Sequence, residues 1–480
     1  MSDRDMSMKK ITLFASVVSS ALLQAATISQ VIVRQQWPWS TDIKVEYMLT
    51  GVTSPVDVAV KAYNGGKELD SPNLQNAIRG ERFGIAEGGV KTLVIDPVAA
   101  FGTATDSIPD FSVELSVTES AGNIGEVLYK IFDLSNGECE DVTRAQLLNG
   151  EKGTVETDYG KIGDGYRTSL GDVVIWTGVT NNPAYKTTHL VMRKIPAKDV
   201  VWQIGSPTDE PGRAVRDSES QKYVKLSQDY YIGVFEFTQA QFESVCGQNT
   251  TYTPVFPLDA AVDKREYPVN NISYSAIRGN MTYTGASGEK INWPTNSELH
   301  EVVADPARVC FLRDLRARCK GVEFDLPFDP QWEFACRAGV YNKGLSDGLG
   351  LRSGAEASDR LDVLGWYSAN SEVQAHLVGQ KRPNAFGLYD MHGNVRELLA
   401  NWAGNVSNPT CGSGNNADDA MVDPLGPVQS SGARSTRGGS FDFISGYCRS
   451  ASRFAATDYY SVCSNQGFRV VCPVGVKWVE

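Results

Sequence analysis

Apolar and polar residues alternate along the first part of the chain in a way that predicts β-strands. Every second residue is apolar in 43–47 (isoleucine, valine, tyrosine) and in 56–60 (three valines). Successive side chains of a strand point to opposite faces, so this period of two predicts strands that are buried on one face. Further strands are predicted in the apolar segments 90–95 and 111–117. Short strands separated by turns predict an all-β, immunoglobulin-like sandwich over residues 27–120.

The pattern becomes irregular in the rest of the chain. Residues 121–189 contain isolated apolar runs between glycine-containing loops, which predicts a β-rich bridging segment. Residues 190–474 contain two short helical patterns, 239–246 and 330–337, among many short apolar segments and long loops. We expect Asp329 to cap the second helix. This mixture predicts an α+β domain with little regular secondary structure.

The N-terminus has the composition of an export signal. Two lysines, Lys9 and Lys10, precede the apolar stretch 11–23, and small residues follow at Ala25 and Ala26. The stretch is shorter than a membrane-spanning helix, although a short transmembrane anchor is the alternative interpretation. No other segment reaches that length. We therefore predict a signal peptide at residues 1–26, no membrane span in the mature chain, and a secreted or periplasmic location.

Composition narrows the classes of partner. The chain has 480 residues, enough for two or three domains, and its hydrophobic content of 41% is that of a globular protein. A net charge of −12 argues against a nucleic-acid partner, because phosphate binding requires basic surfaces. Nine cysteines suit an oxidising compartment, where disulfides form, and the odd number leaves at least one thiol unpaired.

The segment 381–402 carries the densest candidate chemistry. Asp390, Gly393, Asn394 and Glu397 place two carboxylates and an amide around a glycine within eight residues. Oxygen ligands on a tightly turning backbone are typical of a calcium site. The alternative is a polar turn between two packed segments.

The same segment resembles a sequence block of the formylglycine-generating enzyme family, also called the sulfatase-modifying factor family. That block reads Asn-x-x-Gly-Leu-x-Asp-Met-x-Gly-Asn-Val in both. Six further blocks resemble the family in the same order, at 203–213, 229–242, 324–339, 437–441, 448–453 and 467–471. The resemblance covers residues 190–474 and implies an irregular α+β fold related to C-type lectins.

The resemblance implies a calcium site in this segment. Asp390 and Glu397 would bind the ion through their side chains, and Gly393 and Val395 through their backbone carbonyls. A second calcium site of the family would use the side chain of Asn370 and the carbonyl of Ser371. The loop that supplies the remaining ligands of this second site is shortened here.

The resemblance also bears on catalysis. The family's oxidase binds copper(I) through two cysteines that follow a Gly-Gly-Ser block, and it converts a cysteine of a target peptide to formylglycine. Ser440 matches a serine of that active site, but Phe443 stands where the nearer copper ligand belongs. The segment up to Cys448 is too short for the other ligand, so copper is not expected. Another branch of the family binds iron. The positions of the four histidines of this chain do not predict whether it binds iron.

The resemblance further implies two disulfides. Cys336 would pair with Cys448, as the matching cysteines do in the vertebrate enzyme. Cys319 would pair with the last strand near Cys472, although the family's cysteine aligns with Val470.

Two functions from different classes follow from these observations. The first is a secreted, calcium-stabilised module that binds a protein or glycan ligand without turnover. The alternative is a metal- and oxygen-dependent oxidoreductase of the formylglycine-generating type, acting on a cysteine of a protein substrate through an unusual site that includes Cys463 or Cys472.

Overall fold

The computed structural model divides the chain into two compact units. The first consists of residues 1–127, 142–156 and 176–178, and the second of 128–141, 157–175 and 179–480. Within these units the structure describes residues 26–35, 41–71, 74, 77–102, 108–120, 125–156, 174–208, 210, 213, 219–247, 266–278, 310–320, 322–338, 361–404, 413–424, 433–455 and 461–474. The predicted signal peptide lies outside these ranges except for Ala26.

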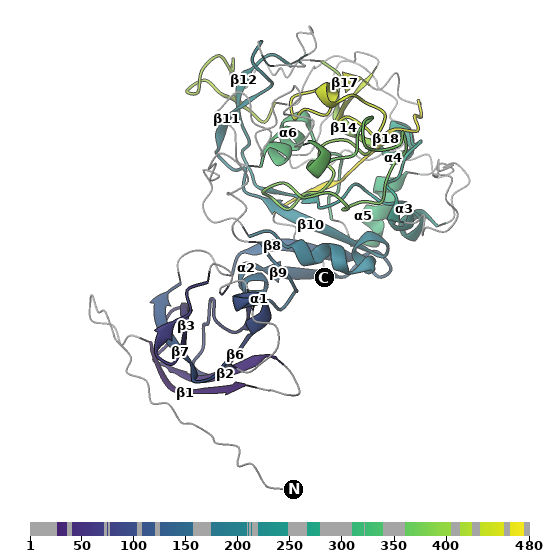
Figure 1. Ribbon diagram of the computed structural model, residues 1–480. Helices are drawn as coiled ribbons and strands as arrows, with labels where there is room; N and C mark the ends of the chain where they lie inside the picture. The colour runs from purple at the N-terminus through teal and green to yellow at the C-terminus, as the bar shows by residue number, and fades with distance from the viewer. Residues whose placement is uncertain are drawn as a thin grey trace. The chain divides into compact units, whose positions relative to one another are not determined.

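The N-terminal unit contains two antiparallel sheets (Figure 1). The first has the strand order β1-β2-β6-β5, with bounds Thr27–Gln35, Ile43–Thr50, Gly89–Ile95 and Ile78–Gly80. The second has the order β4-β3-β7, with bounds Lys67–Glu68, Val56–Asn64 and Phe111–Glu119. The unit's described residues also form two five-residue helices, α1 (Pro97–Phe101) and α2 (Arg144–Leu148).

One hydrophobic core joins the two sheets. Alternate residues of β2, β3 and β7 are buried, and they belong to a single cluster: Ile43, Val45, Tyr47, Leu49, Val56, Val58, Val60, Phe111, Val113 and Leu115. The predicted strands and the β-rich character of this region are therefore confirmed. The prediction holds because each strand buries one face and exposes the other, and alternation of apolar and polar residues indicates strands of this kind.

Hydrogen bonds of the Asn149 side chain link the segment after α2 to the sandwich. Its side-chain oxygen accepts hydrogen bonds from the backbone N–H groups of Arg82, at 3.1 Å, and Phe83, at 2.9 Å. Its amide donates to the carbonyl of Phe83 at 3.3 Å. The side chain is buried, so bulk water cannot replace these hydrogen bonds when they are lost.

We expect Asn149→Ala to destabilise the N-terminal unit by about 1–3 kcal/mol, because two backbone donors lose their acceptor. Hydrogen exchange of β5 and β6 in the full chain measures this loss. Asn64→Ala, an exposed change at the end of β3, serves as the control and is expected to leave protection unchanged. Equal protection in both variants would contradict the anchoring role of Asn149.

The described part of the C-terminal unit forms three sheets and short helices. Its largest sheet has the order β19-β13-β10-β8-β9, with bounds Val471–Pro473, Tyr230–Gly233, His189–Ile195, Val127–Asp133 and Cys139–Thr143. A three-stranded sheet has the order β11-β12-β15, with bounds Val201–Ile204, Lys222–Lys225 and Met421–Val422. A four-stranded sheet has the order β17-β16-β14-β18, with bounds Phe454–Ala455, Arg434–Arg437, Arg396–Trp402 and Gln466–Gly467. The predicted bridge 121–189 is thus divided between the units.

The helices of this unit are short, as the sequence predicts. They are α3 (Gln239–Cys246), α4 (Tyr274–Arg278), α5 (Phe311–Arg318) and α6 (Asp329–Arg337), with 3₁₀ turns η3 (Thr177–Asn181), η4 (Pro183–Lys186) and η7 (Ser445–Tyr447) near or within it. The expected capping role of Asp329 is wrong. Phe328 precedes α6, and the Asp329 carboxylate is bound by two arginines from elsewhere in the chain. No helix in the described ranges is long and apolar enough to cross a membrane.

Candidate functional site

The segment that carries the candidate ligands lies inside the C-terminal unit. Every residue from 383 to 402 is buried, although the segment contains several charged and amide side chains. Asp390, Gly393 and Asn394 have positive φ angles of 58°, 100° and 53°. Buried polar groups must find partners within the protein, so this backbone and its neighbours have to satisfy each side chain.

Glycine is required at position 393. A Cβ atom there would lie 2.0 Å from the carbonyl oxygen of Trp366, and φ is in the region that favours glycine. The Gly393 N–H donates to the carbonyl of Gly438 at 2.7 Å, and the Asn394 N–H donates to the carbonyl of Trp366 at 2.8 Å. This close approach fixes the loop between Asp390 and Glu397.

Glu397 is paired with an arginine. The guanidinium of Arg469 donates to both carboxylate oxygens of Glu397, with distances of 2.7 and 2.9 Å. The Trp332 indole N–H donates to the same carboxylate at 2.7 Å. All three side chains are buried. In this structure a bidentate arginine therefore neutralises the Glu397 carboxylate, and its implied role as a calcium ligand stays a prediction.

Asp390 has an oxygen without a partner. Its Oδ2 accepts a hydrogen bond from the Gly379 N–H at 2.7 Å, whereas Oδ1 is buried and accepts none. Burial raises the pKa of Asp390 to about 6. A buried carboxyl group with one unsatisfied oxygen is the kind of group that either binds a cation or keeps a proton.

Glu236 lies in the same electrostatic environment, although no sequence pattern identified it as a site residue. Its carboxylate accepts hydrogen bonds from the Asn394 side chain at 2.6 Å and from the Val395 N–H at 3.0 Å. Burial, followed by the negative charges of Asp390 and Glu397, raises the pKa of Glu236 well above its ordinary value. The available sequence signal was an acidic residue inside the apolar segment Val-Phe-Glu-Phe.

The residues of the implied second calcium site are engaged within their own loop. The Asn370 side-chain oxygen accepts from the Tyr367 N–H at 2.9 Å, and its amide donates to Asp362 and Gly365. The carbonyl of Ser371 lies 2.9 Å from Nε2 of His376. Across the described ranges, no three histidine, cysteine, aspartate or glutamate side chains are arranged to hold one metal ion.

A second buried charge cluster lies between α6 and β16. Arg437 and Arg453 both bind the carboxylates of Asp329 and Glu333, and Arg337 donates to Glu333 at 2.8 Å. Burial opposes ionisation of Glu333, but the three arginine charges outweigh it and lower its pKa to about 2. This cluster directly precedes the Gly438-Gly439-Ser440 turn and therefore helps to position it.

Ser440 is adjacent to an aromatic cluster. Its hydroxyl donates to Asp442 Oδ1 at 2.7 Å, and the Asn465 amide donates to both oxygens of Asp442. The next residue, Phe443, packs against Tyr447 and Phe454 with ring centroids 5.6 and 4.9 Å apart. We call Phe443, Tyr447 and Phe454 the aromatic triad. Tyr447 is 39% exposed, so the triad reaches the surface.

Neither implied disulfide is present in this structure. The four cysteines concerned are free thiols: Cys319, Cys336, Cys448 and Cys472. Each packs against other groups instead; the sulfur of Cys336 lies 3.5 Å from the Ser450 hydroxyl, and that of Cys472 lies 3.8 Å from the sulfur of Met192. Burial raises the pKa of Cys319 and of Cys448 to about 12, which keeps both thiols protonated at neutral pH.

Comparison with known proteins agrees with the sequence blocks. A model of the family "Sulfatase-modifying factor enzyme 1-like domain" matches residues 194–474. The chain is 26% identical over 218 residues to a chaperone protein LppX of Paenibacillus barcinonensis, covering 40% of this chain and 69% of that one. It is 32% identical over 151 residues to the formylglycine-generating enzyme of Streptomyces coelicolor, covering 30% and 45%.

A solved structure, Treponema denticola variable protein 1, is also similar. It is 23% identical, with a TM-score of 0.40, over 60% of this chain and 96% of that one. The family match spans more than half of the chain, so the predicted family is confirmed. This chain belongs to the sulfatase-modifying factor enzyme 1-like family.

Proposed function

We propose that this protein is a ligand-binding member of its family and not a copper-dependent oxidase. One observation carries the proposal: an aromatic ring, Phe443, stands where the nearer copper-binding cysteine of the oxidase belongs, and it packs into the aromatic triad. A phenyl ring cannot bind a metal ion as a thiolate does. Ser440, which matches a family active-site serine, donates instead to Asp442.

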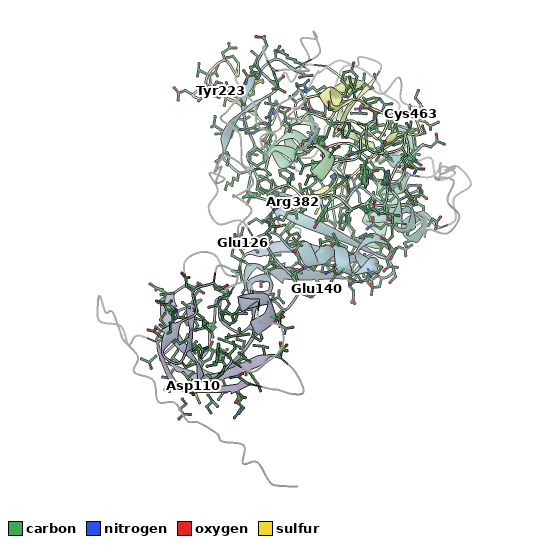
Figure 2. All side chains as sticks on the ribbon, in the orientation of Figure 1. Asp110, Glu126, Glu140, Tyr223, Arg382 and Cys463 are labelled. Atoms are coloured by element: carbon green, nitrogen blue, oxygen red, sulfur yellow. The ribbon has the colours of Figure 1, made fainter. Side chains whose placement is uncertain are left out.

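The cysteine nearest to this turn is also unsuited to copper. The sulfur of Cys448 packs against Gly439, where a Cβ atom would come within 2.5 Å of it. Its raised pKa keeps it a protonated thiol, whereas copper(I) is bound by thiolates. For the alternative oxidoreductase, Cys472 is fully buried beside Met192, and Cys463 is half-buried near β18 (Figure 2). Neither arrangement favours that alternative.

The surface around the aromatic triad suits a protein or glycan ligand. Tyr447 and Ile444 are exposed, and Asp442 offers carboxylate oxygens beside them. Apolar rings with a few fixed polar groups are the usual lining of a binding site. Phe443 lies between β16 and η7, Tyr447 ends η7, and Phe454 begins β17. The rings of Tyr447 and Phe454 are also in contact, with centroids 5.2 Å apart.

We propose further that the protein is exported, calcium-stabilised and built from two known folds. The strand orders β1-β2-β6-β5 and β4-β3-β7 correspond to the A-B-E-D and C′-C-F strands of an immunoglobulin sandwich, which supports an immunoglobulin-like N-terminal unit. The short helices and irregular loops of the C-terminal unit suit a C-type-lectin-like fold. The free oxygen of Asp390 supports a bound cation.

The test is a binding screen of the full chain on a glycan array and a displayed peptide library. We expect a ligand whose affinity falls at least about tenfold in Tyr447→Ala, because an exposed ring at a contact commonly contributes 1–2 kcal/mol or more. Val90→Ala, an exposed apolar change in the N-terminal unit, is the matched control and should bind normally. Copper-dependent oxygen consumption with a cysteine peptide would contradict the proposal.

A further inference from the structure

Arg396 of β14 is a buried arginine without a partner for its charge. The residue is 9% exposed, and its Nε–H group is buried and donates no hydrogen bond. Within the described ranges, no carboxylate forms an ion pair with its guanidinium. Removing a charge from water without giving it a partner is costly. This position therefore calls for an anionic partner.

The other buried arginines described in the C-terminal unit all have a partner for the guanidinium. Six pair with carboxylates: Arg278, Arg337, Arg437, Arg449, Arg453 and Arg469. The guanidinium carbon of Arg193 lies 4.9 Å from the ring centre of Tyr129. That of Arg434 lies 3.6 Å from the ring centre of Trp402. Among the described residues Arg396 has neither kind of contact, which sets it apart from the arginines that stabilise the fold.

Arg396 shares one face of the four-stranded sheet with two other polar groups that lack partners. Arg396 lies opposite Gln466 of β18, and Leu398 lies opposite Thr436 of β16. Opposite residues point to the same face, as do residues two apart along a strand. Gln466 Oε1 and Thr436 Oγ1 are buried and have no hydrogen-bond partner. The Gln466 amide nitrogen donates to the carbonyl of Ile272 at 3.1 Å, which leaves its oxygen as a free acceptor.

The aromatic triad continues the same face of the sheet. Phe454 of β17 lies opposite Thr436, so its ring projects on the side that carries Arg396. The planes of the three rings are inclined to one another by 56°, 68° and 85°, so they do not form one flat platform. Ile444 beside them is 60% exposed. An angular apolar surface with an aliphatic chain suits an apolar side chain of a peptide better than the flat face of a sugar ring.

Two simpler partners for these groups do not suffice. The Arg396 N–H donates to the carbonyl of Asn465 at 2.9 Å, and the Asn465 amide donates to both oxygens of Asp442. The Ser440 hydroxyl also donates to Asp442, so this carboxylate is already engaged. Ordered water can satisfy an amide oxygen or a hydroxyl, but it brings no charge to Arg396.

We propose that Arg396 binds the carboxylate of an acidic residue in a peptide ligand, and that the aromatic triad holds an adjacent apolar side chain. A guanidinium holds a carboxylate through two parallel hydrogen bonds. Beside it, Gln466 Oε1 accepts from an N–H of the ligand, and the Thr436 hydroxyl donates to a carbonyl. The inference rests on the proposed function, which it narrows from a protein or glycan ligand to an acidic peptide.

The experiment is a calorimetric titration of the full chain with acetyl-leucyl-glutamyl-leucine amide and with the same peptide containing glutamine. We expect the glutamate peptide to bind at least about tenfold more tightly, because only it offers a charge-assisted contact to Arg396. Arg396→Gln should remove this preference. Arg79→Gln is the matched control, since it removes the same charge from a side chain that is 59% exposed, and it should retain the preference.

The melting temperature separates a binding role of Arg396 from a structural one. Without ligand, Arg396→Gln is expected to melt about 2–4 °C higher than the unchanged chain, because it removes an unpaired buried charge. Arg453→Gln, at an arginine that pairs with Asp329 and Glu333, is expected to melt lower. If Arg396→Gln lowers the melting temperature as Arg453→Gln does, Arg396 has a structural partner and the inference is wrong.

The binding results also separate this inference from the proposed function. Equal affinity for the two peptides, or no binding of either, overturns the inference. Binding of a glucuronic-acid disaccharide through Arg396, without binding of the glutamate peptide, overturns it in favour of an acidic glycan. A library ligand that depends on Tyr447 but not on Arg396 refutes the inference and leaves the proposed function standing. If neither the library nor the glycan array yields any ligand, both are wrong.

Discussion

Replacing Arg437 by alanine is expected to destabilise the C-terminal unit by about 3–5 kcal/mol. Arg437 binds Asp329 and Glu333, and all three side chains are fully buried. It also donates to the carbonyls of Ser450 and Ser452. Removing the guanidinium leaves Arg453 and Arg337 as the remaining partners of the two carboxylates. It also leaves a cavity beside Trp332. Urea denaturation of the full chain, followed by tryptophan fluorescence, measures the change.

A surface ion pair provides the matched comparison for this prediction. Lys61 and Glu68 are 3.4 Å apart, with side chains 58% and 48% exposed. Lys61→Ala should change stability by less than about 1 kcal/mol, because solvent already screens the pair. Arg437→Lys should fall between the two variants, since a lysine keeps the charge but not the two-pronged contact. If Arg437→Ala costs no more than Lys61→Ala, the buried cluster does not hold the turn before Ser440.

The N-terminal sandwich was predictable because its information is local. Each of its long strands buries alternate residues, so strand identity and the buried face follow from the same few positions, as in Val56, Val58 and Val60. Its sheet order was not predictable in this way. The pairing of β2 with β6, for example, joins Ile43 to Ile95 across a stretch that contains three other strands.

The charge clusters of the C-terminal unit were predictable only as separate residues. Arg437, Arg469 and Glu397 each lie in a block that resembles the family, but the partners lie far apart: 104 residues separate Arg437 from Glu333, and 72 separate Arg469 from Glu397. A local pattern says nothing about such pairs. Glu236 was missed for the same reason, since its role depends on Asn394 and Asp390, more than 150 residues further along the chain.

The disulfides show where the structure differs from a family resemblance, and the cap of α6 shows where it differs from a local preference. Family position predicted bonds for Cys336 and Cys448, but the structure gives each thiol a different packing environment. An acidic residue at the start of a helix suits a cap, yet Asp329 pairs with arginines, because two buried guanidinium groups offer stronger, charge-assisted hydrogen bonds. In both cases the tertiary environment outweighs the local preference.

Gly393→Ala is expected to disrupt the buried loop and to cost about 4 kcal/mol or more. The added Cβ atom would lie 2.0 Å from the carbonyl oxygen of Trp366 and 2.8 Å from its carbon, and a φ of 100° is strained for alanine. Neither obstacle can be relieved by rotating a side chain, because the obstructing atoms are backbone. The Asn394 N–H would also lose its hydrogen bond to the same carbonyl.

This loop also presents Asp390 and the N–H of Val395, so its displacement should remove the proposed calcium-induced stabilisation together with basal stability. Gly125→Ala is the control, because no atom lies within 4 Å of the added methyl group and its backbone is not left-handed. Calorimetry of both variants with and without calcium measures the two effects at once. A Gly393→Ala variant that melts near the unchanged protein and still responds to calcium would mean that the loop tolerates another backbone path. The close contact with Trp366 would then not be what fixes the site.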